Sequence, residues 1–356
     1  MESGRVNFQS DGIRTWEAPS PREIGEAVKD FLQILGGPTW LRLPGHDRSR
    51  TRAISTLLHG NEPSGIRALF HYIRSGEQPA VDLVCFIGAV EAALAPPGFA
   101  HRNMPGHKDL NRCFREPVTL SEELIAIEVL RRFREANPEA LIDLHNTSGR
   151  SPAYGVTTQL GVVQKTLTSL FSHHLVLTDL RLGTLMEATE FDFPTITVEC
   201  GGAGDPASDK VALEGLTRYA RTESVKDLEP AFDSVIVFQH PVRVELREGM
   251  KVSYGSEPLP DADLTLCHDA DRHNFGVVHA GEVLGWPGPR GLEALCARDS
   301  AGKDRTNEIL KENSGCLEVS RAGHILMMTT DPDIAKDDCL FYWIPINEQE
   351  VPVAQE

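Results

Sequence analysis

Three short apolar segments, each running into a polar and chemically reactive residue, limit the fold of this chain more than any other feature. In chain order they are Arg52–Leu58 before His59, Ala140–Leu144 before His145, and Thr195–Val198 before Glu199. Such runs are typical of strands that are buried on both faces of a sheet. Between them lie segments predicted as helices, including Pro21–Leu35 and Ser121–Ala136. This alternation predicts an α/β fold.

The clearest helix signal is the apolar periodicity of Ser121–Ala136. The apolar residues that share one face of this helix are Leu124, Ile127, Leu130 and Phe133. Three- and four-residue spacing of this kind is typical of a helix that packs one face against a core.

Beyond about Leu228 the pattern changes to short strand-like segments separated by turn residues. They are Val235–Phe238, Val242–Leu246, Gly276–His279, His324–Met328 and Leu340–Ile344. A length of 356 residues is also sufficient for two domains. We therefore predict a catalytic domain over residues 1–230 and a smaller, β-rich C-terminal domain over residues 231–356.

Charge and hydropathy argue against two classes of partner. The net charge is -17, whereas a nucleic-acid-binding protein needs clustered Lys and Arg to displace counterions from phosphates. No run of about 18 apolar residues occurs, so a membrane-spanning helix is not expected. The first residues lack the pattern of a signal peptide, and the seven irregularly spaced cysteines do not suggest a disulfide framework. We therefore expect a cytoplasmic protein without a nucleic-acid or membrane partner.

The segment His59–Gly65 places a histidine and a glutamate three positions apart, where a strand is predicted to give way to a helix. At such a turn His59 and Glu62 can point at one metal ion, and their ligand atoms suit Zn²⁺. With 13 His and 52 acidic residues, roughly two pairs at this spacing are expected by chance. His279 and Glu282 form another such pair, to which we assign no role. The spacing alone therefore does not establish a metal site.

Two more polar residues stand at the ends of predicted strands, His145 and Glu199. Ligand sites in open α/β sheets form at the carboxyl ends of strands. His145 could supply the third protein ligand of a catalytic zinc site, which keeps its fourth position for water. Asp143 could accept the other imidazole N–H. Glu199 closes an apolar strand, where a carboxylate is costly to bury unless it is paired or beside a metal. A structural or solvent-exposed role is the alternative for both residues.

The segment Asp109–Arg112 adds a guanidinium group among polar residues. Its planar fork of N–H donors matches the geometry of a carboxylate. By itself, however, this segment is more typical of an ordinary surface loop.

Taken together and in this order, these segments resemble the motifs of the succinylglutamate desuccinylase and aspartoacylase family, within the wider zinc carboxypeptidase-like group. The segments are His-Gly-Asn-Glu-Pro-Ser-Gly at 59–65, Asp-Leu-Asn-Arg at 109–112, Asp-Leu-His-Asn-Thr at 143–147 and Val-Glu-Cys-Gly-Gly at 198–202. The resemblance covers about residues 50–205. It implies a carboxypeptidase-like mixed β-sheet flanked by helices, followed by a smaller β-rich domain.

The resemblance also implies the catalytic machinery. His59, Glu62 and His145 would be the ligands of one zinc ion per chain. Glu199 would act as general base and then as general acid. Arg102 would be the arginine that stabilises the oxyanion, although the stretch from it to the Asp-Leu-Asn-Arg segment is about two residues longer than in the family.

For the substrate, the resemblance implies that Asn111 and Arg112 bind a carboxylate and that Asn146 also contacts the bound molecule. Two departures concern the identity of that molecule. The family usually has an Asn-Pro turn where Gly88–Glu91 stands here. Aspartoacylases also place a substrate-selecting arginine about ten residues before the catalytic glutamate, whereas the nearest arginine upstream here is Arg181. The core chemistry is therefore implied, but the named substrates of the family are not.

These observations predict a zinc-dependent hydrolase that cleaves the amide bond of a small N-acylated amino acid or related amine by means of metal-activated water. Two alternatives remain. One is a zinc carboxypeptidase that acts on peptides, and the other is a metal-binding protein that has kept the ligands without turnover. The sequence leaves the oligomeric state open, including that of a homo-oligomer.

Overall fold

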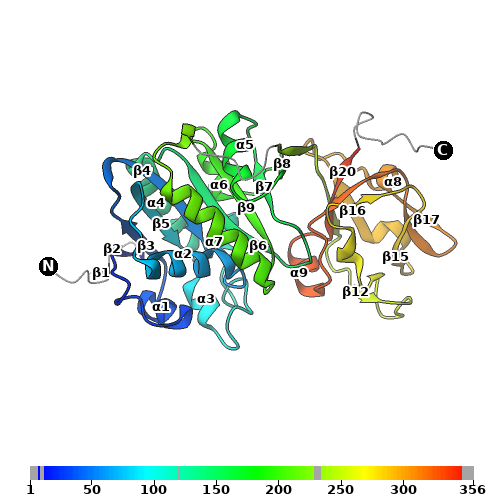
Figure 1. Cartoon of the computed structure of the whole chain (residues 1–356). Coiled ribbons are helices and arrows are strands. Elements are labelled where there is room, and N and C mark those ends of the chain that lie inside the picture. The colour runs from blue at the N-terminus through cyan, green and yellow to red at the C-terminus, as the bar shows by residue number, and fades with distance from the viewer. Residues whose placement is uncertain (1–6, 9–11, 119–120, 228–233, 347–356) are drawn as a thin grey trace. The chain divides into compact units, whose positions relative to one another are not determined.

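The computed structural model describes residues 7–8, 12–118, 121–227 and 234–346 (Figure 1). Within these residues the chain forms two compact units. The first consists of the residues up to Asn146, Ala153–Val176 and Arg181–Val237, and the second of Thr147–Pro152, Leu177–Leu180 and the residues from Phe238 onward. Two short segments of the N-terminal part therefore belong to the second unit.

A mixed sheet of ten described strands dominates the first unit, in the order β1-β2-β3-β5-β4-β6-β9-β7-β8-β10. The strands are β1 (Asn7–Phe8), β2 (Arg14–Glu17), β3 (Thr39–Leu43), β4 (Asp47–Thr56), β5 (Val81–Ile87), β6 (Leu141–Thr147), β7 (Tyr154–Thr157), β8 (His174–Leu177), β9 (Thr195–Gly202) and β10 (Ile236–Gln239). Strand β4 runs parallel to both β5 and β6, whereas β3 pairs antiparallel with β5 and β7 with β9. Parallel neighbours need crossover connections, which helices supply.

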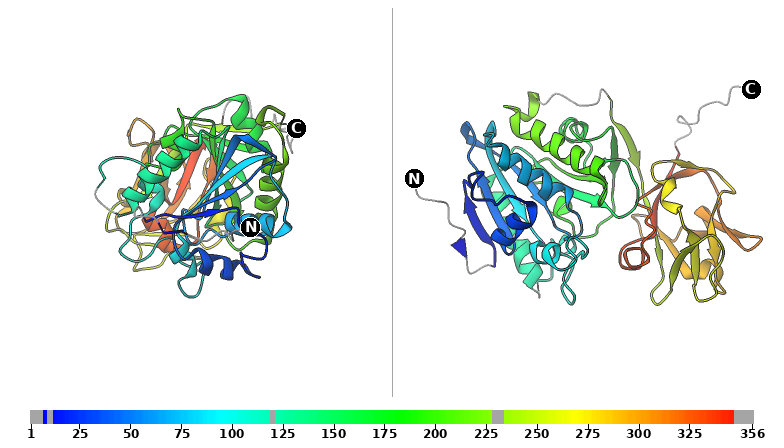
Figure 2. Two further views of the ribbon diagram at one scale, coloured as in Figure 1. Left: turned by 90° about the vertical axis from the view of Figure 1, so that its left-hand side faces the viewer. Right: turned by 60° about the horizontal axis from the view of Figure 1, so that its bottom comes forward.

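Helices cover both faces of this sheet (Figures 1 and 2). They are α1 (Val28–Leu35), α2 (Ser64–Ser75), α3 (Val90–Leu94), α4 (Ser121–Ala136), α5 (Val162–Ser169), α6 (Leu185–Thr189) and α7 (Pro206–Arg221), with short 3₁₀ turns η1 (Leu110–Arg112) and η2 (Val225–Asp227). α1, α2 and α7 contribute to the core on one face, and α4 and α6 to the core on the other. In the described parts of the chain, no helix has the length and apolar character needed to cross a bilayer.

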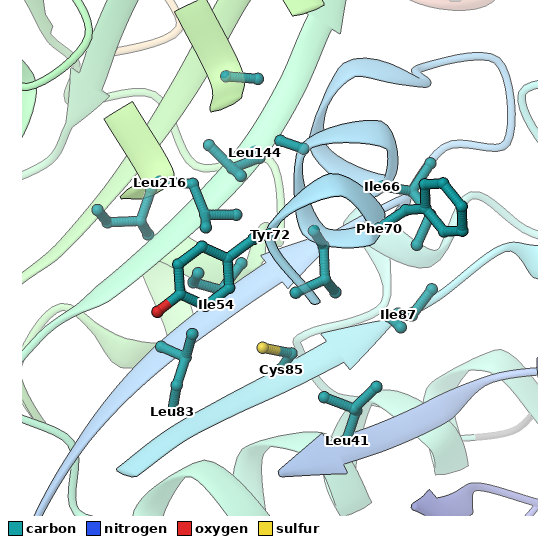
Figure 3. Close-up of a cluster of buried hydrophobic side chains, with 14 of the residues drawn as sticks. Leu41, Ile54, Ile66, Phe70, Tyr72, Leu83, Cys85, Ile87, Leu144 and Leu216 are labelled. Carbon is teal, nitrogen blue, oxygen red and sulfur yellow. The ribbon is translucent and has the colours of Figure 1, made fainter. Parts of the chain in front are cut away.

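Strand β5 shows why both faces of the sheet are covered. Leu83, Cys85 and Ile87 belong to the core that is shared with α2 (Figure 3). Val84 and Phe86 belong to the opposite core, shared with α4. Successive side chains of a strand point to opposite faces, so an uninterrupted apolar run has to be buried on both sides. Each fully buried side chain of this kind contributes about 1.5–3 kcal/mol.

Three strand ends bring the reactive residues to the same part of the sheet. β4 and β6 are parallel neighbours, with Thr56 opposite Leu144, and β9 lies next to β6. His59 follows the end of β4, whereas His145 and Glu199 lie near the ends of β6 and β9. The sheet order therefore makes neighbours of three residues that are far apart in the sequence.

The second unit contains two five-stranded sheets in its described part, β14-β19-β20-β11-β16 and β12-β13-β15-β18-β17. Its elements are β11 (Val242–Leu246), β12 (Val252–Gly255), β13 (Leu264–Cys267), η3 (Ala270–His273), β14 (Val277–Val278), β15 (Val283–Pro287), η4 (Gly291–Ala294), β16 (Leu295–Arg298), α8 (Thr306–Ile309), β17 (Leu310–Asn313), β18 (Cys316–Val319), β19 (Gly323–Leu326), α9 (Pro332–Asp337) and β20 (Phe341–Pro345). One hydrophobic core, which includes Val244, Leu266 and Trp343, takes side chains from both sheets.

These observations confirm the predicted fold class, a mixed α/β sheet flanked by helices with additional β-sheets. The helix predicted over Ser121–Ala136 has those bounds. The predicted apolar face is confirmed only in part: Leu130 and Phe133 are buried, whereas Leu124 is 61% exposed and Ile127 is also exposed. Val129 is buried in addition. Two apolar stripes lie side by side on this helix, and periodicity alone does not decide which of them packs on the sheet.

The helix predicted over Pro21–Leu35 begins only at Val28. Gly25 has a φ of 82°, in the left-handed region that a right-handed helix excludes. The Asp30 side chain accepts a hydrogen bond from the backbone N–H of Ala27 at 3.0 Å, and this bond caps the first turn. A capping aspartate and a left-handed glycine therefore set the true start of α1.

Candidate functional site

His59, Glu62 and His145 form a buried group in the first unit. One ligand atom from each of them lies within 4.8 Å of the other two. Nδ1 of His59 is 2.8 Å from Oε1 of Glu62, and Nδ1 of His145 is 2.7 Å from Oε2 of the same carboxylate. The two imidazole rings meet edge to face, with their centroids 5.1 Å apart. Three potential ligand atoms thus face a common point, and the group could hold a metal ion.

A carboxylate holds the far nitrogen of each histidine. Nε2 of His145 is 2.8 Å from Oδ2 of Asp143, and Nε2 of His59 is 3.0 Å from Oδ1 of Asp109. Metal-binding histidines usually donate their second N–H to an acceptor of this kind, which fixes the tautomer and the ring orientation. The contact of Asp143 confirms the expectation from the sequence. The contact of Asp109 was not foreseen, and its only signal was an acid at the head of the Asp-Leu-Asn-Arg segment.

Charged neighbours shift the pKa values of all three residues of this group. Although burial opposes it, His59 and His145 hold the pKa of the Glu62 carboxyl far below its ordinary value. Burial also opposes protonation of His145, but Asp143 and Glu62 raise its pKa well above the usual range. The pKa of His59 is raised as well, by Glu62 and Asp109 against burial and the charge of Arg102. Because histidine binds a metal in its neutral form, a metal ion held by this group would displace protons from the two histidines.

Two glycines let the first motif approach its surroundings. A Cβ on Gly65 would lie 2.1 Å from Oγ1 of Thr56, so the start of α2 can pack on the end of β4 only with glycine at this position. A Cβ on Gly60 would lie 2.7 Å from the carbonyl oxygen of His101. The backbone N–H of Gly60 donates to the carbonyl of Arg102 at 2.8 Å. The His-Gly-Asn-Glu-Pro-Ser-Gly segment thereby binds the loop that carries Arg102.

Arg102 lies beside the group of His59, Glu62 and His145, despite the longer stretch that separates it from the Asp-Leu-Asn-Arg segment. Its Nε donates to Oδ2 of Asp109 at 3.0 Å, and Nη2 is 2.9 Å from the same oxygen. Nη1 lies 3.7 Å from Oε1 of Glu62. One carboxylate, that of Asp109, therefore orients both His59 and Arg102.

Glu199 belongs to the same buried cluster. It lies on β9 and is 9% exposed, and its Oε2 is buried without a hydrogen-bond partner among the described residues. Burial raises the pKa of its carboxyl to about 7; the charge of His145 lowers this pKa, and the charge of Glu62 raises it further. A carboxyl with this pKa can accept and release a proton near neutral pH.

Asn111 and Arg112 lie on η1, directly after Asp109. Oδ1 of Asn111 accepts a hydrogen bond from the backbone N–H of Leu185 at 3.1 Å, so this side chain also anchors the start of α6. Nη1 of Arg112 donates to the carbonyl of Asn111 at 3.1 Å. Both residues belong to the turn that follows Asp109, the residue in contact with His59, and their part in substrate binding stays a prediction.

Two acidic residues in the segment before Glu199, Glu187 and Glu190, already have partners within the protein. Glu187 accepts hydrogen bonds from the backbone N–H of Leu182 at 2.8 Å and of Gly183 at 2.9 Å, and thus closes the turn before α6. Glu190 accepts two hydrogen bonds from Nη1 of Arg181, at 2.8 and 2.9 Å. Arg181, the nearest arginine upstream of Glu199, is therefore engaged in an ion pair with Glu190.

The remaining candidate residues have structural contacts. The side chain of Asn146 hydrogen bonds with Ser64 and Gly201. In the second unit, Oε2 of Glu282 accepts from the backbone N–H of His279 at 2.9 Å, a contact that closes a turn. The His279–Glu282 pair, to which no role was assigned, is not part of the group that could hold a metal ion.

No family model matches the chain, and no curated protein matches it. Its fold is nevertheless shared with solved structures over most of its length. A succinylglutamate desuccinylase/aspartoacylase from Rhodobacter sphaeroides is 14% identical, with a TM-score of 0.54 and coverage of 85% of this chain and 87% of that one. A succinylglutamate desuccinylase from Vibrio parahaemolyticus is 16% identical, with a TM-score of 0.55 and coverage of 86% and 85%. The product-bound ectoine utilization protein EutE (DoeB) from Ruegeria pomeroyi is 16% identical, with a TM-score of 0.53 and coverage of 87% and 88%.

Proposed function

We propose that the chain is a zinc-dependent amidohydrolase that removes the acyl group from a small N-acylated amino acid or a related amine. The observation that carries this proposal is the convergence of two histidines and a glutamate on one point, with the buried carboxyl of Glu199 in the same cluster. The fold supports it, because solved structures with this fold include proteins named as succinylglutamate desuccinylases. All proposed site residues fall within residues 1–230, which we assign as the catalytic domain.

The residues of the group suit zinc. His59 and His145 would bind it through Nδ1 and Glu62 through a carboxylate oxygen, which leaves room for water and substrate as in catalytic zinc sites. When bound, zinc lowers the pKa of a water molecule from 15.7 to about 7 and polarises the amide carbonyl. Asp109 and Asp143 would hold the two imidazoles in the required orientation.

Glu199 would accept the proton of the attacking water at its carboxylate and deliver it to the leaving nitrogen. Its raised pKa suits both halves of this transfer, and its unpartnered Oε2 leaves an oxygen available for it. Proton transfer by a positioned side chain is typically worth roughly 10²–10⁴ in rate. Arg102, held by Asp109, would stabilise the negative charge that develops on the carbonyl oxygen.

Arg112 and Asn111 would bind a carboxylate on the substrate, since a guanidinium fork matches a carboxylate in two parallel hydrogen bonds. An N-acylated amino acid carries such a carboxylate. A carboxypeptidase substrate carries one as well, so a peptidase that acts on C-terminal residues is the second candidate. A non-catalytic metal-binding protein is disfavoured by Glu199, because a buried carboxyl oxygen without a hydrogen-bond partner among the described residues is costly to keep without a function.

The test is a substrate screen with the zinc-loaded protein. N-acetyl, N-succinyl and longer N-acyl amino acids are assayed for released primary amine, alongside dipeptides with free C-terminal carboxylates. We expect turnover of at least one N-acyl amino acid and much slower cleavage of the dipeptides. Faster cleavage of dipeptides would identify a carboxypeptidase, and no turnover of any amide by protein that binds zinc would favour the non-catalytic alternative.

A further inference from the structure

A single buried amide connects three of the chain segments that carry the proposed site. Oδ1 of Asn146 accepts a hydrogen bond from the backbone N–H of Ser64 at 2.9 Å. Its Nδ2 donates to Oγ of Ser64 at 2.9 Å and to the carbonyl oxygen of Gly201 at 3.0 Å. Asn146 is 3% exposed. An asparagine amide has two N–H groups, so both donors are engaged within the protein.

The partners of this amide are close in sequence to three different site residues. Asn146 itself follows His145, Ser64 lies two residues after Glu62, and Gly201 lies two residues after Glu199. The backbone N–H of Asn146 also donates to Oε2 of Glu62, at 3.3 Å. One side chain thereby joins the segments of two proposed metal ligands and of the proposed general base.

The contact with Ser64 meets a need of the helix that starts there. The first N–H groups of any helix lack partners within it, and Pro63, at the start of α2, offers no side chain that could cap them. Asn146 supplies the acceptor from a neighbouring strand. A buried N–H left without a partner costs about 1–3 kcal/mol, so the position of α2 on the end of β6 depends on this contact.

The hydroxyl of Ser64 extends the connection to a fourth element. Oγ of Ser64 is 2.7 Å from Oδ1 of Asp209 on α7, and Oδ2 of Asp209 pairs with Nη1 of Arg67 at 2.8 Å. A carboxylate only accepts, so the Ser64 hydroxyl donates to Asp209 and accepts from Asn146. The direction of each hydrogen bond in this chain is therefore determined.

We propose that Asn146 is a positioning residue, which holds Glu62, His145 and Glu199 in their relative places and makes no essential contact with the substrate. The proposal builds on the proposed function for the identity of the metal and the role of Glu199. It replaces the substrate contact that the sequence motif suggested for this residue. With both N–H groups bound to the protein, the amide has no donor left for a ligand.

The two roles predict different measurements. Loss of a substrate contact raises KM and leaves the affinity for the metal unchanged. Loss of a positioning contact weakens metal binding and lowers kcat while KM changes little, because the carboxylate-binding residues are untouched. Partners that orient metal ligands are typically worth 10- to 100-fold in metal affinity, and we expect a loss of about this size in Asn146→Ala.

The experiment measures zinc affinity of the metal-free full chain by competition with a chromophoric chelator, followed by kcat and KM of the zinc-loaded protein. Three variants are compared. Asn146→Ala removes the amide, and Ser64→Ala removes the hydroxyl but keeps the backbone N–H that donates to Asn146. Asp209→Asn keeps a side-chain oxygen that can accept from the hydroxyl of Ser64. We expect zinc affinity to fall most in Asn146→Ala, less in Ser64→Ala and least in Asp209→Asn. If Asn146→Ala does not fold, Ser64→Ala carries the same test.

Asn274→Ala is the matched control. In the second unit, Asn274 makes the same pattern of three hydrogen bonds, donating to the carbonyls of Arg150 and Met328 and accepting from the N–H of Met328, each at 2.8 Å. Its loss should lower the unfolding temperature without changing zinc affinity. Unchanged zinc affinity with a raised KM in Asn146→Ala would overturn the proposal and leave the proposed function intact. Wild-type protein that binds no zinc would instead contradict the proposed function.

Discussion

Asp109 and His59 are 50 positions apart in the sequence, yet Oδ1 of the aspartate lies 3.0 Å from Nε2 of the histidine. The other carboxylate oxygen of Asp109 binds Arg102. A proposed metal ligand and a proposed oxyanion-stabilising group therefore depend on one side chain. His145 has its own carboxylate, Asp143, whose Oδ1 is buried without a hydrogen-bond partner among the described residues, so Asp143 offers a natural comparison.

Asp109→Asn and Asp143→Asn test this arrangement. Each change removes a negative charge behind a proposed ligand, so each should weaken zinc binding by about 10- to 100-fold, as measured by chelator competition. Asp109→Asn should in addition lower kcat at saturating zinc, because Arg102 loses its ion-pair partner. Equal kcat in the two zinc-saturated variants would show that Asp109 does not orient Arg102 for catalysis.

The group of proposed metal ligands predicts how much zinc the protein contains. Purified protein should contain close to one zinc ion per chain by elemental analysis, and His145→Ala should lose most of it while the fold is retained, as judged by circular dichroism. His279→Ala is the control, because it removes the histidine of the other His–Glu pair. Zinc lost in the control and kept in His145→Ala would move the site to the second unit.

Glu199→Gln tests the general base. The amide keeps the size of the side chain but cannot accept the proton of water, so kcat should fall by on the order of 10²-fold or more. Zinc content and KM should stay close to those of the wild type, since the metal has its ligands elsewhere. Loss of zinc together with activity would make Glu199 a ligand, and wild-type activity would return it to a structural role.

The raised pKa of Glu199 predicts that the stability of the metal-free protein depends on pH, and Glu199→Gln tests this. In the folded chain the pKa of Glu199 is about 7, above its ordinary value of 4.5. The folded state therefore binds more protons than the unfolded state between these values, and its stability falls as the pH rises through this window. Glutamine does not titrate, so Glu199→Gln lacks this loss. Its free energy of unfolding at pH 8 should exceed that of the wild type by roughly 1–3 kcal/mol. Urea unfolding at pH 4 and pH 8 checks this, and a difference that is larger at pH 4 contradicts it.

Arg102→Ala and Arg112→Ala separate two uses of a guanidinium group. The charge that Arg102 would stabilise develops only in the transition state, so its loss should mainly lower kcat. A carboxylate bound by Arg112 is present in the ground state as well, so its loss should mainly raise KM. Steady-state kinetics on the best substrate from the screen distinguish the two. If Arg102→Ala mainly raises KM and Arg112→Ala mainly lowers kcat, the roles assigned to the two arginines are reversed.

The sequence by itself determined the elements whose signals are local. Leu83–Ile87 of β5 form an apolar run because both faces of the sheet are buried there, and the regular spacing of Ser121–Ala136 predicts a helix with the observed bounds. The meeting of His59 and His145 was also predictable, because parallel strands bring their carboxyl ends to one edge of the sheet. These inferences need only the period of the pattern and the direction of the strands.

Only the tertiary structure decided which contacts support those residues. Asp109 binds His59 across 50 positions, and the Asn146 amide reaches segments 82 and 55 positions away. Such bonds leave no periodic trace, because each depends on how a loop or a strand end is packed and not on its neighbours in sequence. The same holds for the stripe of α4 that is buried, which is decided by the shape of the sheet beneath it.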